Sequence, residues 1–449
     1  MLPPELADFS GREVLVEECM KLLADCTNSG VPAAVCLYGQ GGIGKTTVAV
    51  QLAHGAAQRF PNGRILVRLG EGPHATGRAL AICLRALGVA DAAMPADADE
   101  RSALLRERLA DRAVLVILDG VTDEDQVRQL FPGAGRSALL VTCRHRLDAI
   151  EGLVHRDLPL LPEVDALHLL ERIVGPEGMR ANREASAELV RYCDWLPLAL
   201  RIAAARLAAR PGWSVQDLVA HLAEEPSRLD WLQIGDRAVR TTFMATCSQL
   251  QDTERALFRR LGSLPHPEFP AWVAAALLDT GFARADLLLD HLTEAHLIES
   301  VGRDTTGQRY RMHELLRLFA RELADAEDEP AELASARSRA YDGWCALARR
   351  AGDAQPGWIA QDPEPTPAWV PHDLVVAAVV ADPAGWFETE WGAALAVIRD
   401  CAETGLSRTA WPLAQRLIGF FDRTNRLDDW EVACESGLLA GVRNDDLAG

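Results

Sequence analysis

The residues with the clearest chemical meaning lie in one short stretch, which reads GQGGIGKT from Gly39 to Thr46. It fills the pattern G-x-x-x-x-G-K-S/T, in which a flexible backbone points its N–H groups at a phosphate. Lys45 can reach the β- and γ-phosphates of a nucleotide, and the Thr46 hydroxyl can bind Mg²⁺. The turning residues are Gly39, Gly41, Gly42 and Gly44. We therefore predict a phosphate loop. The alternative is a glycine-rich turn that binds nothing.

The residues on either side of this stretch support the prediction. The apolar run 35–38 is typical of a buried strand, and Val48 and Leu52 fall on one face of a helix that follows. Among 46 lysines and arginines, lysine stands only at Lys21 and Lys45. A compact point charge is therefore used where a phosphate would need it.

An acidic residue follows a second apolar run, Val114–Leu118. Asp119 would end a parallel strand beside the phosphate loop, where a carboxylate can hold Mg²⁺. The alternative is an aspartate that only begins a turn. Gly120 follows, at a position where many hydrolytic proteins carry a second acid that orients the attacking water. A glycine at this position argues against fast hydrolysis.

A basic residue follows another predicted strand, 138–142. Ligands gather at the carboxyl edge of a parallel sheet, so Arg144 is a candidate sensor of the γ-phosphate. The alternative is a solvated arginine, of which Arg146 is a nearby example.

Composition limits the class of protein. The length of 449 residues suggests about three domains. The net charge of −19 argues against a general nucleic-acid surface. Ten cysteines form no C-x-x-C pair, so neither a zinc site nor a disulfide framework is indicated. With no signal peptide and no apolar run of ~18 residues, we expect a cytoplasmic protein without a membrane segment.

The pattern of strands alternating with helices changes to helices alone from about Pro162. Within the helical part, Pro197 would occupy a first helical turn, where its missing N–H costs little. The stretch 230–240 is interpreted as a linker.

The second half is predicted to begin with helices and a hairpin, with strands at 297–301 and 308–312, which suggests a winged-helix domain. An acidic linker, 325–329, and an irregular proline-containing crossing, 356–371, would follow. Helices with aromatic contacts return from Asp373 and are typical either of an α-solenoid or of a plain helical domain.

Four domains are therefore predicted. They are an α/β P-loop nucleotide-binding domain with a parallel sheet (1–158), a helical domain (159–235), a winged-helix domain (236–328) and an all-α, TPR-like region (329–449). The chain stops at Gly449 with little sign of a polar capping repeat, which is compatible with a fragment.

Short motifs in this order resemble the NB-ARC module of STAND-class signalling ATPases over about residues 5–325. They are FSGRE from Phe9, GQGGIGKTT from Gly39, VLVILDG from Val114, LLVTCR from Leu139, WLPLAL from Trp195 and MHE from Met312. Longer phrases, such as MHELLRLFARELA, are similar to the SARP-type regulators of antibiotic biosynthesis in actinobacteria. Those regulators usually carry a DNA-binding and transcriptional-activation part before the ATPase, and this part is absent from the present sequence.

The resemblance implies a site for ATP or ADP with Mg²⁺. Arg12 would contact the base or ribose, and Pro197 would pack on the adenine. The phosphates would be held by Gly39, Gly41, Gly42, Ile43, Gly44, Lys45, Thr46 and Thr47. The metal ligands would be Thr46 and Asp119.

The resemblance also implies a switch. Arg144 would sense the γ-phosphate, so Lys45, Asp119 and Arg144 would be the catalytic residues of a weak ATPase. His313 would reach the β-phosphate of ADP and lock the domains, unless it is only a capping or core histidine. Glu314 replaces the aspartate of the family motif, and its longer side chain would loosen this lock.

The leading hypothesis is an ADP-locked switch that opens and self-associates when ATP replaces ADP. DNA and RNA polymerase would be reached through the absent N-terminal part. Two alternatives are a P-loop ATPase whose turnover is itself the function, and a protein that binds DNA through the winged-helix domain.

Overall fold

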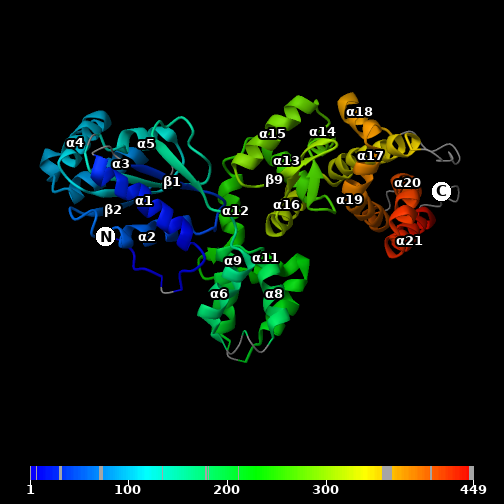
Figure 1. Cartoon of the computed structure of the whole chain (residues 1–449), viewed down its shortest axis with the longest axis horizontal. Coiled ribbons are helices and arrows are strands. Elements are labelled where there is room, and N and C mark those ends of the chain that lie inside the picture. Colours follow the sequence, from blue (N-terminus) through cyan, green and yellow to red (C-terminus); the bar gives the residue numbers. More distant parts are fainter. Residues whose placement is uncertain are drawn as a thin grey trace. The chain divides into compact units, whose positions relative to one another are not determined.

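The computed structural model describes residues 2–6, 8–29, 33–69, 74–133, 135–176, 179, 182–210, 212–355, 367–404 and 407–443 (Figure 1). The chain folds into two compact units, Met1–Thr246 and Cys247–Gly449. Each unit buries its own set of apolar side chains. The four predicted domain boundaries stay predictions.

The first unit is built on a five-stranded sheet in which every neighbouring pair of strands is parallel. The strand order is β2 (Arg64–Arg68), β3 (Leu115–Val121), β4 (Ala138–Cys143), β1 (Ala34–Tyr38) and β5 (Leu153–Asp157). The predicted parallel sheet is confirmed. The sequence did not reveal β5, because this edge strand is short and contains His155 and Arg156 in place of an apolar run.

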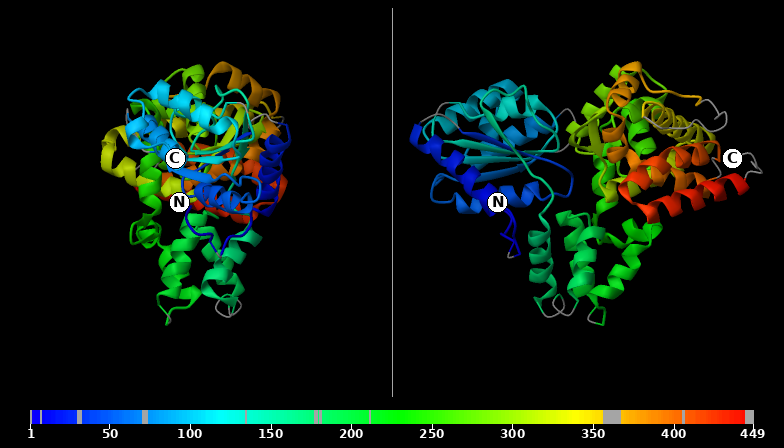
Figure 2. Two further views of the ribbon diagram at one scale, coloured as in Figure 1. Left: turned by 90° about the vertical axis from the view of Figure 1, so that its left-hand side faces the viewer. Right: turned by 45° about the vertical axis from the view of Figure 1, so that its right-hand side comes forward.

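Helices cover both faces of this sheet, as the right-hand view of Figure 2 shows. On one face, α1 (Glu13–Ser29) and α2 (Lys45–Gly55) pack against β1. On the other, α3 (Ala75–Ala86), α4 (Ala98–Ala110) and α5 (Glu124–Leu130) share a core with alternate residues of the strands. This alternation follows from the two-residue period of a strand.

A group of helices completes the first unit. Its members are α6 (Glu163–Val174), α8 (Arg183–Tyr192), α9 (Pro197–Ala208), α10 (Val215–Ala223) and α11 (Arg228–Trp231). Pro197 stands in the first turn of α9, as predicted. The tight turn that precedes it places Asp194 and Trp195 at φ values of 53° and 51°.

The predicted linker 230–240 is wrong. It contains the end of α11, a two-stranded hairpin of β6 (Gln233–Ile234) and β7 (Arg237–Ala238), and the start of α12 (Val239–Cys247). Gly235, with φ of 58°, supplies the left-handed residue that so short a hairpin requires.

The second unit begins with α13 (Asp252–Gly262), α14 (Trp272–Leu278) and α15 (Phe282–Glu294). An antiparallel sheet follows in the order β8 (Glu268–Pro270), β10 (Gly307–Arg311) and β9 (Glu299–Asp304). The predicted hairpin is therefore present, with its first strand shifted from 297–301 to Glu299–Asp304 and a third strand added. Its assignment as part of a winged-helix domain stays a prediction.

The predicted acidic linker 325–329 is wrong, because α16 (Glu314–Glu327) continues into it. Arg259 of α13 holds both acidic side chains at the end of this helix. Its guanidinium lies 2.9 Å from Glu327 and 2.6 Å from Asp328. Charge that would favour a solvated linker is therefore neutralised within the unit.

The C-terminal part of the second unit is helical. It contains α17 (Pro330–Asp353), α18 (Asp373–Ala381), α19 (Pro383–Thr404), α20 (Ser407–Thr424) and α21 (Leu427–Arg443). Most of the predicted irregular crossing, residues 356–366, lies outside the described residues. Within the described part of the chain, no helix combines the length and the apolar character needed to cross a bilayer.

A buried charge cluster ties the hairpin to these helices. Arg309 of β10 forms ion pairs with Asp304, at 2.7 Å, and with Glu390 of α19. The Glu390 side chain is only 1% exposed and also accepts a 2.7 Å hydrogen bond from the Trp344 indole of α17. Arg309 has two carboxylate partners and keeps Asp304 when Glu390 is removed. The buried Trp344 indole N–H, by contrast, would lose its acceptor.

We expect Glu390→Ala to lower the free energy of unfolding by about 1.5–3 kcal/mol, because the Arg309 guanidinium and the buried Trp344 indole N–H each lose a charged hydrogen-bond partner. Urea denaturation of the whole chain, followed by tryptophan fluorescence, would measure the change. The control is Asp429→Ala, which removes a more exposed ion pair with Arg426 and should cost at most about 1 kcal/mol. Equal effects of the two substitutions would contradict the prediction.

Candidate functional site

The phosphate loop connects β1 to α2 and has the backbone that its glycines permit. Gly39, Gly42 and Gly44 have φ values of 144°, 81° and 97°, in the region that side-chain-bearing residues rarely adopt. Gly44 is the N-cap of α2 and provides no side-chain cap. The first N–H groups of α2 are thus without a capping side chain, which is the arrangement that binds anions at helix N-termini.

The glycines are also required by close packing. A Cβ atom at Gly41 would lie 2.6 Å from the Thr242 side chain of α12, and one at Gly42 would lie 3.1 Å from Leu198 of α9. The Leu198 N–H donates a 3.2 Å hydrogen bond to the Gly42 carbonyl. The start of α9 is therefore fixed directly against the loop.

Lys45 is folded back on this loop. Its Nζ donates hydrogen bonds of 2.7 Å to the Gly39 carbonyl and 2.9 Å to the Gln40 carbonyl. The pKa of Lys45 is lowered to about 8, chiefly by burial and in smaller part by the nearby Arg144 charge. An anion beside the loop would offset this effect, because an opposite charge favours the protonated amine.

Thr46 and Asp119, the two predicted metal ligands, lie together. The Thr46 hydroxyl donates a 2.6 Å hydrogen bond to Asp119 Oδ1. The prediction that Asp119 ends its strand is wrong, because β3 continues to Val121. The strand register shifts at this point, where Gly120 has φ of 79°.

Hydroxyl and carboxylate oxygens suit Mg²⁺, which commonly takes one or two protein ligands and completes its shell with phosphate and water. The described part of the chain contains no group of three or more His, Cys, Asp or Glu residues that could hold a metal alone. The pair of Thr46 and Asp119 therefore fits a metal that arrives with a phosphate.

Thr142 of β4 holds this carboxylate in place. Its hydroxyl donates a 2.7 Å hydrogen bond to Asp119 Oδ1 and accepts a 2.9 Å bond from the Gly120 N–H. Sequence analysis did not single out Thr142, because its partner lies on the neighbouring strand.

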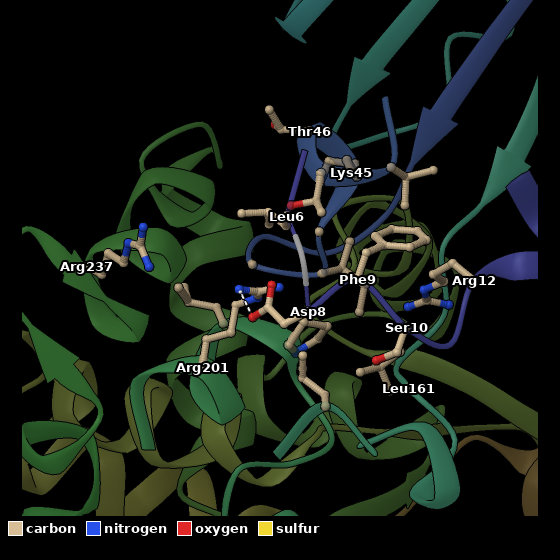
Figure 3. A pocket seen from close by; sticks show the side chains of 18 residues that line it. Leu6, Asp8, Phe9, Ser10, Arg12, Lys45, Thr46, Leu161, Arg201 and Arg237 are labelled. Carbon is tan, nitrogen blue, oxygen red and sulfur yellow. Dashed lines mark ion pairs between the residues drawn. The ribbon is translucent and has the colours of Figure 1, made fainter. Parts of the chain in front are cut away.

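A cavity of about 390 Å³ opens beside the loop (Figure 3). This volume lies within the usual range for small-molecule sites. The cavity brings together most of the predicted nucleotide-binding residues. Its lining comprises Leu6, Asp8, Phe9, Ser10, Arg12, Gly42, Ile43, Gly44, Lys45, Thr46, Thr47, Val48, Leu161, Leu169, Pro197, Leu198, Arg201 and Arg237.

Arg12 enters this cavity from the start of α1. Its guanidinium donates a hydrogen bond to the Pro159 carbonyl. Burial lowers its pKa, and the carboxylates of Asp165 and Asp157 act in the opposite direction. This buried guanidinium lines the cavity and already donates a hydrogen bond within the protein.

Gly39, Gly41 and Asp119 do not line the cavity, although they belong to the loop or bond to Thr46. Arg144 and His313 lie elsewhere. Arg144 does not line the cavity, and its guanidinium donates a hydrogen bond to the Ala245 carbonyl of α12. His313 belongs to the second unit, where it precedes α16 and lies 3.3 Å from Glu299. The hydrogen bond from His313 lowers the pKa of Glu299. Nucleotide contacts by Arg144 and His313 stay predictions.

Several lining residues were not predicted. Asp8 and Arg201 form a 2.6 Å ion pair at the cavity, and Arg237 comes from the short β7 strand. No local pattern connects an acid before α1 with an arginine inside α9, so the sequence offers no signal for this pair.

The parallel sheet, its phosphate loop and the adjoining cavity define a P-loop nucleotide-binding domain. Residues 12–179 match the sequence model of the NB-ARC domain. The chain therefore contains an NB-ARC domain over these residues, which confirms the resemblance for this part of the chain. The motifs that begin at Trp195 and Met312 lie beyond the matched residues.

The chain is 40% identical over 422 residues to the regulatory protein AfsR of Streptomyces griseus, an alignment that covers 93% of this chain and 42% of that protein. It is 38% identical over 426 residues to AfsR of Streptomyces coelicolor, an alignment that covers 91% of this chain and 42% of that protein. The chain thus spans less than half the length of these relatives. A STAND protein with a tetratricopeptide repeat sensor from Pyrococcus horikoshii aligns with 97% of this chain and 59% of its own, at 16% identity. Its TM-score of 0.34 supports no further argument.

The pKa of Lys45 predicts a pH dependence of stability. Between about pH 8 and pH 10.5 the unfolded chain binds more protons at this residue than the folded chain, so stability should rise with pH. Relative to Lys45→Met, we expect a gain of about 3 kcal/mol across this window. Urea denaturation of both proteins without nucleotide would measure it. A constant difference between them would contradict the prediction.

Removing the Thr142 hydroxyl should weaken the metal site. We expect Thr142→Val to lower the affinity for Mg²⁺ about tenfold, because Asp119 loses its orienting hydrogen bond. Calorimetric titration of nucleotide with and without Mg²⁺ would measure this. Thr293→Val is the matched control, because the Thr293 hydroxyl bonds only within its own helix in the second unit. An equal loss of affinity without Mg²⁺ would contradict the assignment.

Proposed function

We propose that this chain is the nucleotide-dependent switch of a transcriptional regulator, and that its first unit binds ADP or ATP with Mg²⁺. The observation that carries the proposal is the cavity lined jointly by the phosphate loop, Arg12 and Pro197, beside the hydrogen-bonded pair of Thr46 and Asp119. One end of this arrangement suits phosphates and the other is largely apolar, as a nucleotide requires.

Within this proposal the phosphates lie against the loop residues, and Arg12 and Pro197 hold the base and ribose. The bound Mg²⁺ would neutralise phosphate charge, and Thr46 and Asp119 would hold it. Arg144 would sense the γ-phosphate after leaving its present hydrogen bond with Ala245. Gly120, which cannot orient water as an acid would, makes hydrolysis slow.

The second unit supplies the other half of the switch. In the ADP state His313 contacts the β-phosphate and holds the protein closed. Exchange for ATP removes this contact, exposes surfaces for self-association, and slow hydrolysis restores the closed state. A ligand can shift such an equilibrium only through different contacts in the two states, and His313 provides that difference.

We further propose that residues 236–328 form a winged-helix domain and residues 329–449 a TPR-like sensor. The similarity to the AfsR regulatory proteins supports a regulatory role. A role in transcription and in antibiotic biosynthesis, in the cytoplasm, is what the resemblance to SARP-type regulators implies. In such a regulator DNA and RNA polymerase would be contacted by an additional N-terminal part.

The nucleotide released from the purified protein tests the switch. We expect near-stoichiometric ADP after denaturation, because a closed site retains the nucleotide that it holds most tightly. Ion-exchange chromatography of the supernatant would identify it. Turnover of added ATP should stay below ~1 s⁻¹, under the ordinary range of enzymes.

Two variants sharpen this test. Lys45→Ala should abolish retention of ADP, because the loop loses its phosphate-binding charge. His313→Ala should release ADP faster while ATP still binds. Fast turnover by the wild-type protein would favour an ATPase whose turnover is itself the function, and would contradict the switch.

A further inference from the structure

The segment before α1 forms one side of the candidate nucleotide cavity. We call its described residues, 2–6 and 8–10, the strap. Four of them, Leu6, Asp8, Phe9 and Ser10, line the cavity together with the phosphate loop and the first turns of α9 (Figure 3). A nucleotide in this cavity would therefore be enclosed partly by the strap.

The strap is attached to α2, which covers the parallel sheet, and to α6 of the helical group. His54 of α2 lies 2.8 Å from the Pro3 carbonyl, and Arg172 of α6 donates a hydrogen bond to the Phe9 carbonyl. Both contacts involve the strap backbone.

The third attachment is made by a side chain at the cavity itself. Asp8 Oδ2 lies 2.6 Å from Nη1 of Arg201 on α9, and each of these side chains is 21% exposed. Figure 3 shows this ion pair between the strap and α9. Because both partners line the cavity, the pair joins two of its walls.

In the closed strap, one buried polar atom, Ser10 Oγ, has no hydrogen-bond partner among the residues that the structure describes. A buried polar group without a partner regains a hydrogen bond when water reaches it, so this residue favours opening. A partly exposed ion pair is of modest strength and favours the closed state by a factor of about five. The balance between the two arrangements is therefore fine enough for single substitutions to shift it.

We propose that the Asp8–Arg201 ion pair latches the strap across the cavity and sets the rate at which nucleotide enters and leaves. The proposal rests on the nucleotide site proposed above and assigns its regulation. Asp8 and Arg201 are positioning residues, because they act through the strap.

A latch has a kinetic signature that a ligand contact lacks. In this proposal the latch is closed in both the free and the occupied protein, so breaking it should raise the association and dissociation rate constants together. The dissociation constant, which is their ratio, should stay unchanged. Loss of a direct contact would instead raise the dissociation rate constant and weaken binding.

Stopped-flow fluorescence with a fluorescent ADP analogue would measure both rate constants in the full chain. We expect Asp8→Asn to raise each about fivefold, in line with the strength of a partly exposed ion pair. The exchanged pair, Asp8→Arg with Arg201→Asp, should return both rates toward the wild-type values, because it restores the attraction.

The matched control is Asp91→Asn. It breaks a 2.6 Å ion pair with Arg85 on the surface, and neither residue lines the cavity. Both rate constants should be unchanged. This control removes the same charge, so it separates the latch from a general effect of net charge on an anionic ligand.

Three results would overturn the latch. If Asp8→Asn changes neither rate constant, the ion pair does not limit exchange. If only the dissociation rate constant changes, Asp8 acts as a contact. If the wild-type protein binds no nucleotide at all, the proposed site fails and the latch fails with it.

Discussion

All strands of the five-stranded sheet run in one direction, so their carboxyl ends meet at one edge of the sheet. The geometry of the site depends on this constraint. It places the phosphate loop after β1, Asp119 near the end of β3 and Thr142 near the end of β4 within hydrogen-bonding reach of one another. A strand running in the opposite direction would carry its residue to the far edge, and the pair of Thr46 and Asp119 would not form.

The second wall of the site comes from the helical part of the first unit. The turn before α9 brings Pro197 and Leu198 against the loop, and the Leu198 N–H bonds directly to Gly42. A side chain at Gly42 would press on Leu198, so the loop conformation and the position of α9 are coupled. Any movement of α9 during nucleotide exchange would therefore change the packing and hydrogen bonding of the phosphate loop.

In the second unit the hairpin is connected to the C-terminal helices by buried charge. Arg309 pairs with Glu390 of α19, and β10, which carries it, leads directly to His313. An ion pair this deeply buried is costly to separate, so the hairpin and α19 should move together. If the C-terminal helices sense a signal, this connection offers a physical route toward His313.

The sequence by itself determined the features that are local in the chain. The phosphate loop is a contiguous pattern of eight residues, Gly39–Thr46. Three apolar runs, 35–38, 114–118 and 138–142, indicate β1, β3 and β4. Pro197 indicated the start of α9 because proline is best tolerated in the first turn of a helix.

Tertiary structure decided everything that depends on pairing across the chain. Thr142 reaches Asp119 from a neighbouring strand, Asp8 meets Arg201 on a distant helix, and Arg144 bonds to Ala245. The acidic stretch 325–329 has the composition of a solvated linker, but Arg259 of α13 forms ion pairs with two of its acidic side chains. Side-chain partners of this kind are chosen by the packing of whole elements, and no periodicity or local motif in the sequence records that choice.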